Sequence, residues 1–157
     1  MNRPACFLDI PAIINLGFKY VEEEVKPTGH HSSSWDADLS AHHLCQSLTD
    51  DNIFLWVSTS AGGDVVGFLW AAIHPMAPWC NTPVASDYLF YINPEYRGKY
   101  CAIGLIKAYR KWAEDKGCAE ARLSLASGIN QERVGCTYEL LGFEAFGSVY
   151  CKHYKET

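Results

Sequence analysis

Residues 91–106, which read YINPEYRGKYCAIGLI, combine residue types that can hold an anion. An apolar run ends at Ile92, and a short basic loop, Arg97-Gly98-Lys99, leads into an amphipathic helix that we expect to begin near Ala102. The first N–H groups of a helix have no partner inside the helix, and the helix macrodipole places positive potential there. With two cationic side chains beside it, this strand–loop–helix turn is predicted to bind a diphosphate.

Two further stretches stand in a fixed order with this loop. Residues 130–143 read NQERVGCTYELLGF, and the chain starts with a strand-like segment and a helix entry at residues 3–13. In this order the three stretches resemble the GNAT superfamily of N-acyltransferases, whose acyl-CoA loop has the pattern Q/R-x-x-G-x-G/A and whose last helix ends Y-E-x-x-G-F. Arg97 and Ala102 match the loop pattern, whereas Tyr100 replaces its middle glycine.

The resemblance implies a fold and an activity. The expected fold is α/β (α+β), a mixed, mostly antiparallel central sheet flanked by about four helices, formed by residues 1–157 as a single domain. The expected activity is transfer of an acetyl group from acetyl-CoA directly to a primary amine of a small molecule or a peptide. Because Tyr100 departs from the pattern and the general base is poorly determined, a catalytically weak or inactive acyl-CoA-binding module remains the alternative.

The resemblance also assigns coenzyme contacts. Backbone groups of the strand before the loop are expected to contact the pantetheine arm and the acyl carbonyl, and the loop is expected to hold the diphosphate. The full set of expected contacts is Phe90, Tyr91, Ile92, Arg97, Gly98, Lys99, Tyr100, Cys101, Ala102 and Asn130.

Two residues are candidates for acid–base chemistry. By resemblance, Tyr138 lies beside the sulfur, where a phenol with a pKa of ~10 can return a proton to a coenzyme thiolate with a pKa near ~8.5. Tyr138 also shares a helical face with Val134 and Leu141, so a purely structural role in the core is the competing interpretation. Asp87 is the candidate base, although it could also only cap a strand, and residues 22–24 are three adjacent glutamates that usually form a solvated face.

The composition narrows the classes of partner. The chain of 157 residues has 13 Lys plus Arg against 18 Asp plus Glu, a net charge of −5. An acidic protein of this kind is not expected to bind nucleic acid or anionic membranes, and it mildly favours a cationic acceptor.

The seven cysteines are scattered and contain no C-x-x-C, which indicates reduced thiols and a cytoplasmic protein. The pairs His30-His31 and His42-His43 lack metal-ligand spacing, so no metal is expected. The longest apolar run, residues 65–73, is too short to span a bilayer, and the resemblance permits a homodimer.

Periodicity and turn residues predict the elements that position these side chains. We expect Asp9 to cap the first helix and Asn130 to cap the last one. Helices are expected at residues 11–24, 38–48, 102–116 and 130–142, and strands at 53–59, 65–73, 86–92 and 121–126, with an irregular loop at 74–85 and one strand or a short hairpin at 144–154.

Overall fold

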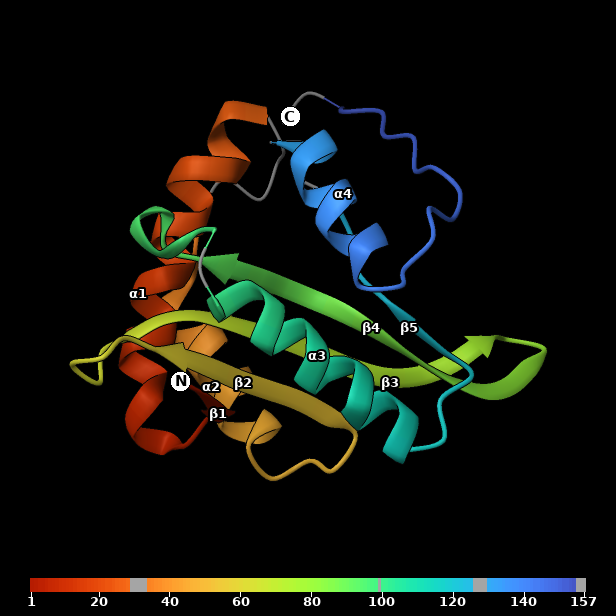
Figure 1. The fold of residues 1–157 in the computed structure, drawn as a ribbon, viewed down its shortest axis with the longest axis horizontal. Coiled ribbons are helices and arrows are strands. Elements are labelled where there is room, and N and C mark those ends of the chain that lie inside the picture. The colour runs from red at the N-terminus through yellow and green to blue at the C-terminus, as the bar shows by residue number, and fades with distance from the viewer. Residues whose placement is uncertain (29–33, 99, 126–129, 155–157) are drawn as a thin grey trace.

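The computed structural model describes residues 1–28, 34–98, 100–125 and 130–154 (Figure 1). Its centre is a five-stranded sheet in which spatial order follows chain order, and only the last strand runs parallel to its neighbour. The strands are β1 (Asn2–Pro4), β2 (Ile53–Thr59), β3 (Val65–Ala77), β4 (Cys80–Ile92) and β5 (Glu120–Arg122). The α-helices are α1 (Ile10–Tyr20), α2 (Ala37–Ser47), α3 (Tyr100–Asp115) and α4 (Gln131–Leu140). The predicted mixed fold with a mostly antiparallel sheet is confirmed.

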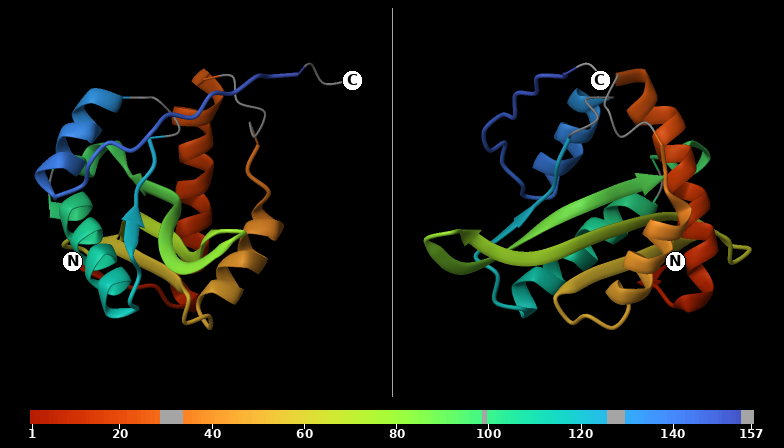
Figure 2. Two further views of the ribbon diagram at one scale, coloured as in Figure 1. Left: turned by 90° about the vertical axis from the view of Figure 1, so that its right-hand side faces the viewer. Right: turned by 180° about the vertical axis from the view of Figure 1, so that it is seen from behind.

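Helices cover both faces of the sheet. Alternate residues of a strand point to opposite faces, so Leu55 of β2 packs with α1 and α2 in one core cluster, whereas Phe54 packs with α3 in the other. Tyr91 and Ile92 divide in the same way at the end of β4. Figure 2 shows the sheet between the two layers from two sides. Because both faces of the sheet are buried, the central strands have near-continuous apolar sequences. Such a sequence does not alternate between apolar and polar residues, so its pattern predicts a strand but not where the strand ends.

The irregular loop predicted at residues 74–85 is wrong. The chain there continues as a long hairpin, in which β3 and β4 pair as far as Ala77 opposite Cys80. Pro75 lies opposite Pro83, and the register shifts between Pro75 and Ala77. Proline cannot donate a ladder hydrogen bond but is tolerated at bulges and near strand ends. The two prolines therefore sit where the pairing is already irregular, and they do not end the strands.

Several predicted boundaries also differ from the structure. α3 begins at Tyr100, two residues before the predicted start, and β5 ends at Arg122. α1 ends at Tyr20 and continues as a π-helical turn, Val21–Val25, and a 3₁₀ turn, Lys26–Thr28. Residues 144–154 contain no strand, and several of their apolar side chains, including Phe146 and Tyr150, are exposed. Among the described helices, none combines the length and the apolar character that crossing a bilayer requires.

An ion pair fixes the junction between β1 and α1. Arg3 donates from both terminal nitrogens to Asp9, at 2.7 and 2.9 Å, and the Cys6 N–H donates to the same carboxylate at 2.8 Å. The side-chain hydrogen bond from Arg3 is the main cause that lowers the pKa of Asp9 to about 2, against the opposing effect of burial. The predicted capping of α1 by the Asp9 side chain is wrong, because that carboxylate makes no cap hydrogen bond to α1 and is committed to Arg3 and Cys6 instead.

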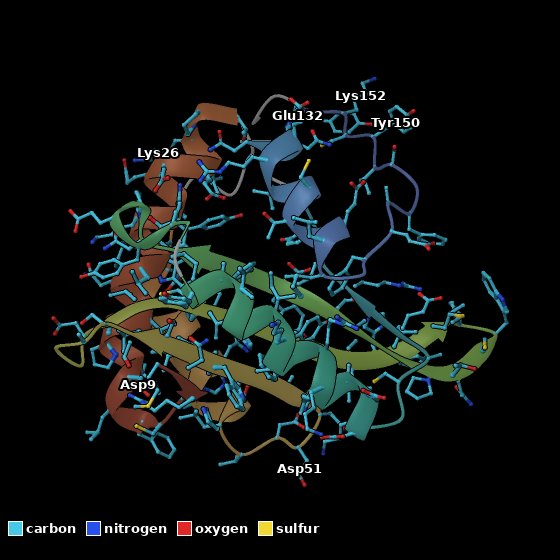
Figure 3. All side chains as sticks on the ribbon, in the orientation of Figure 1. Asp9, Lys26, Asp51, Glu132, Tyr150 and Lys152 are labelled. Carbon is cyan, nitrogen blue, oxygen red and sulfur yellow. The ribbon has the colours of Figure 1, made fainter. Side chains whose placement is uncertain are left out.

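Asp9→Asn should lower the free energy of unfolding by about 2 kcal/mol at pH 7, the linkage value of this pKa shift. The contribution is fully present above the ordinary pKa of 3.8 and is lost as the pH falls towards the folded-state pKa of about 2. Urea unfolding at pH 7 and near pH 2 measures the difference. Asp51→Asn, at an exposed aspartate on the loop before β2 (labelled in Figure 3), is the matched control. Equal stability of the Asp9 variant and the wild type at pH 7 would contradict this account.

Candidate functional site

β4 separates from β5 halfway along its length, and the candidate site lies where they part. β5 pairs only with residues Val84, Ala85 and Ser86 of β4, so within the described residues the outer edge of β4 has no strand partner from Asp87 to Ile92. On its inner edge the register passes from Trp70 opposite Leu89 to Ala71 opposite Asp87, which leaves Tyr88 as an extra residue. A bulge bends the strand that carries it, and bulges are common beside active sites.

The two predicted catalytic residues meet at a third residue, Ser124, in the chain just after β5. The Ser124 N–H donates to Asp87 Oδ1 at 2.9 Å, and its hydroxyl donates to Oδ2 at 3.1 Å. The Tyr138 hydroxyl lies 3.5 Å from the Ser124 carbonyl oxygen. The sequence carried no signal for Ser124, because one serine in an alternating strand pattern is unremarkable. The structure therefore places β4, the segment after β5 and α4 around one group of polar atoms.

Burial and like charge shift the pKa values of this group. Burial raises the pKa of Asp87, and the two hydrogen bonds from Ser124 oppose the rise. Burial, with smaller contributions from Asp87 and Glu24, raises the pKa of Tyr138 far above that of a free phenol. The pKa of Tyr20, on α1, is raised by burial and by the same two carboxylates. Tyr20 and Tyr138 thus lie within the field of Asp87 and Glu24, and both phenols keep their protons at neutral pH.

The side of the molecule that carries this group is formed by the end of α1 and the start of α4. Lys26, just after the π-helical turn, and Glu132, in the first turn of α4, are labelled at the same end of the molecule in Figure 3, and Asp9 lies at the opposite end. The views of Figure 2 agree on this arrangement. Glu24, in the π-helical turn after α1, lies near enough to Tyr138 and Tyr20 to raise the pKa of both phenols.

The predicted diphosphate loop keeps several N–H groups for a ligand and uses others internally. A 3₁₀ turn, Pro94–Tyr96, takes up the N–H of Tyr96 and the N–H of Arg97, which donates to the Pro94 carbonyl at 3.2 Å. Gly98 follows with a φ of +76°, a conformation that favours glycine. α3 starts at Tyr100, whose side chain is 90 % exposed and so leaves the backbone approach open. Cys101 and Ala102 pack partly against the core below α3.

The other expected coenzyme contacts are placed as follows. The side chains of Tyr91 and Ile92 lie in the core. Backbone groups alternate between the two edges of a strand, and the Asn93 N–H donates to Val66 of β3, so the backbone of Tyr91 also faces β3 and that of Phe90 and Ile92 faces the outer edge. Lys99 lies outside the described residues. Asn130 stands at the N-terminus of α4 with a φ of +51° and makes no side-chain cap hydrogen bond, so its predicted role as a helix cap is wrong.

Among the described residues, two arginines with different surroundings lie at the loop. The Arg97 guanidinium turns back towards the π-helical turn and pairs with Glu23 at 2.5 Å and Glu24 at 3.5 Å. Arg133, in the first turn of α4, reaches the loop instead, since its Nη2 is 3.4 Å from the position that a Cβ on Gly98 would occupy. Sequence analysis did not select Arg133, although it stands only three residues after Asn130. Among the residues that the structure describes, no three His, Cys, Asp or Glu side chains gather as metal ligands would.

Comparison with known proteins gives this geometry a context. A sequence model described as "Acetyltransferase (GNAT) family" matches residues 18–143. An aminoglycoside N(6')-acetyltransferase type 1 from Stenotrophomonas maltophilia is 28% identical over 113 residues, which are 69% of this chain and 71% of that protein.

Solved structures share the fold at low sequence identity. Aminoglycoside N-acetyltransferase AAC(6')-Iy in complex with CoA superposes with a TM-score of 0.74 at 19% identity, over 99% of this chain and 94% of that one. A transcriptional regulator from Bacillus halodurans C-125 superposes with a TM-score of 0.74 at 16% identity, over 98% and 99% of the two chains. At these identities the two superpositions establish the architecture alone.

Asp87→Asn should raise the melting temperature at pH 7. The pKa of Asp87 is higher in the folded protein than its ordinary value of 3.8 in the unfolded chain. As the pH rises above 3.8, the unfolded chain releases this proton first, so the free energy of unfolding falls. Once the folded protein has released the proton too, the free energy of unfolding stays at this lower value. Asparagine is neutral and can keep both contacts with Ser124, so it removes this cost. Thermal unfolding from pH 4 to pH 8 should show the gap between variant and wild type widening with pH. A variant that is less stable than the wild type at pH 7 would refute this prediction.

Proposed function

Because the chain belongs to the acetyltransferase (GNAT) family and is an acetyltransferase, we propose that it transfers the acetyl group of acetyl-CoA to a primary amine of a polycationic small molecule of the aminoglycoside kind. The observation that carries this proposal is the group of Asp87, Ser124 and Tyr138 at the point where β4 leaves β5. In this group Asp87 is the base and Tyr138 is the acid, and both lie beside the edge of β4 that has no strand partner among the described residues.

The residues present fit a coenzyme. An extended pantetheine arm can lie along the outer edge of β4, towards which the N–H groups of Phe90 and Ile92 point, while the Ile92 carbonyl accepts from Arg97. The diphosphate fits at Gly98 and the first residues of α3, where a positive φ, unpaired helix N–H groups and the Arg133 guanidinium come together. Tyr100 does not obstruct this approach, since its ring points to solvent.

The acidic surroundings favour a cationic acceptor. Asp87 and Glu24 both raise the pKa of Tyr138 and of Tyr20, so the two carboxylates lie near the same pair of phenols. Coulomb attraction between a carboxylate and an ammonium group is strong when water is partly excluded. An acceptor with several amino groups can satisfy both carboxylates, whereas a neutral molecule with one amine cannot. The named activity of the Stenotrophomonas maltophilia relative supports an acceptor of this kind.

Each residue of the group then has a defined role. Acetyl-CoA supplies an activated thioester, whose carbonyl carbon the amine attacks and whose thiolate leaves. Asp87, fixed at both oxygens by Ser124, holds the incoming ammonium group and takes up its proton. Tyr138 keeps its proton at neutral pH, as a free phenol also does, and its O–H donates a hydrogen bond to the sulfur as negative charge develops there. Free backbone N–H groups of β4 stabilise the negative charge on the acetyl oxygen.

Acetyl transfer to a panel of amines tests the proposal. The panel should hold an aminoglycoside with a 6'-amino group, an aliphatic diamine and a short peptide with a free N-terminus. Mass spectrometry of the acetylated product is the suitable readout, because thiol reagents would also react with exposed cysteines of the protein such as Cys6 and Cys136. The aminoglycoside should be the preferred acceptor. Binding of coenzyme A without turnover of any panel member would favour the non-catalytic alternative.

Tyr138→Phe should reduce turnover by ~10²-fold at saturating substrates, a typical loss for a general acid. The ring and its packing against Phe143 are kept and only the hydroxyl is removed, so stability and coenzyme affinity should change little. Tyr150→Phe, at a side chain that is 94 % exposed, is the matched control. If Tyr138→Phe has wild-type turnover, Tyr138 is only a core aromatic residue.

Arg133→Met should raise the KM for acetyl-CoA about tenfold, which corresponds to about 1.4 kcal/mol of lost charge-assisted binding. The KM for the amine and the turnover number should stay near their wild-type values, because Arg133 lies at the loop by Gly98 and has no contact with Asp87 or Tyr138 among the described interactions. Lys111→Met, on the exposed face of α3, controls for the loss of one positive charge. An unchanged KM for acetyl-CoA would place the diphosphate elsewhere.

A further inference from the structure

The Arg97 side chain is 31 % exposed, and the polar groups of its guanidinium are directed at groups of the protein. Its Nε–H donates to the Ile92 carbonyl at 2.8 Å, and its terminal nitrogens pair with Glu23 and Glu24. Its guanidinium carbon lies 5.4 Å from the centre of the Tyr91 ring, a cation–π distance. We call these five residues the Arg97 cluster. A guanidinium with donors already directed at two carboxylates and a carbonyl is poorly available to a phosphate.

The two carboxylates come from an unusual turn of helix. Glu23 and Glu24 lie in the π-helical turn Val21–Val25, whose first and last residues are buried and anchor it to the core. π-helical turns are rare, and they occur often at functional sites. The Tyr91 hydroxyl donates to Glu23 at 2.7 Å, so Glu23 is bound both by β4 and by the loop that follows it. The shape of this turn therefore depends on residues about 70 positions away in the chain.

The same arginine touches both halves of the proposed site. The backbone of Arg97 directly precedes Gly98 and the start of α3, where the diphosphate is proposed to bind. Through its side chain, it holds Glu24, which lies close enough to Tyr138 and Tyr20 to affect both phenols. The loop and the acidic turn are otherwise on separate elements, at the start of α3 and the end of α1.

We propose that Arg97 is a positioning residue that couples the two substrate sites, by tying the π-helical turn that carries Glu23 and Glu24 to the coenzyme loop. Ordering of the loop by coenzyme then orders the turn, and with it the acidic side of the amine site. The inference rests on the proposed function for the identity of the two substrates. It differs from the ordinary expectation for this position, in which the arginine side chain would bind phosphate directly.

Two-substrate steady-state kinetics tests the coupling. Arg97→Met, which keeps the length and removes the charge, should raise the KM for acetyl-CoA and the KM for the amine together, each about tenfold, with a smaller effect on kcat. Glu23→Gln should raise the same two constants, and the double variant should be no worse than Arg97→Met alone, because both changes break one interaction. Arg97→Lys should restore only part of the effect, since an ammonium group cannot pair with two carboxylates in the same fork geometry.

Hydrogen exchange provides a readout that does not depend on the amine. In the wild type, coenzyme A alone should slow amide exchange in residues 21–25, although the coenzyme is proposed to contact none of them. In Arg97→Met this protection should be lost, while Lys111→Met should keep it. If no amine is accepted but the protection is present, the coupling holds and the proposed acceptor is wrong.

Three results would overturn the inference. A rise in the KM for acetyl-CoA alone, with Glu23→Gln silent, would make Arg97 an ordinary phosphate ligand. A lower melting temperature of Arg97→Met, with both KM values unchanged, would make the cluster merely structural. Equal exchange in residues 21–25 with and without bound coenzyme A would show that the turn does not respond to the loop.

Discussion

The separation of β4 from β5 is the constraint on which the rest of the site depends. A sheet normally satisfies both edges of an inner strand, and here pairing stops after Ser86, next to the extra residue Tyr88. The unpaired edge that results can bind an extended ligand through its backbone. The same divergence carries the chain after β5 towards α4 (Figure 1), and Ser124 in that segment contacts both Asp87 and Tyr138.

Burial and charge act together around Asp87. Burial raises the pKa of the Asp87 carboxyl, so its charge is costly to the folded protein. The neighbouring phenols respond by holding their protons more tightly. The ionised Asp87 is therefore a local cost to the stability of the folded protein. Strongly perturbed pKa values in a cleft are a common property of active sites.

Positive charge is divided between two arginines by the carboxylates around them. Arg97 stands in the loop sequence but is neutralised by Glu23 and Glu24, whereas Arg133 comes from another element and lies beside Gly98. The arginine that matches the family pattern is therefore paired with two carboxylates, and a guanidinium from another element, that of Arg133, lies beside Gly98. An ion pair between partly buried groups holds its geometry better than one between exposed groups, so Arg97 is suited to positioning.

Through its periodicity and its glycine and proline signals, the sequence by itself determined the order of most elements and the turn before α3, and through its resemblance to the GNAT family it indicated the fold class. It also selected Asp87 and Tyr138 as candidates. Only the tertiary structure decided that Ser124 joins them, that Arg97 turns to Glu23, and that residues 74–85 extend a hairpin. Those features arise from contacts between residues distant in the chain, whose register is set by packing of several elements at once. No local pattern encodes which side chains such packing brings together.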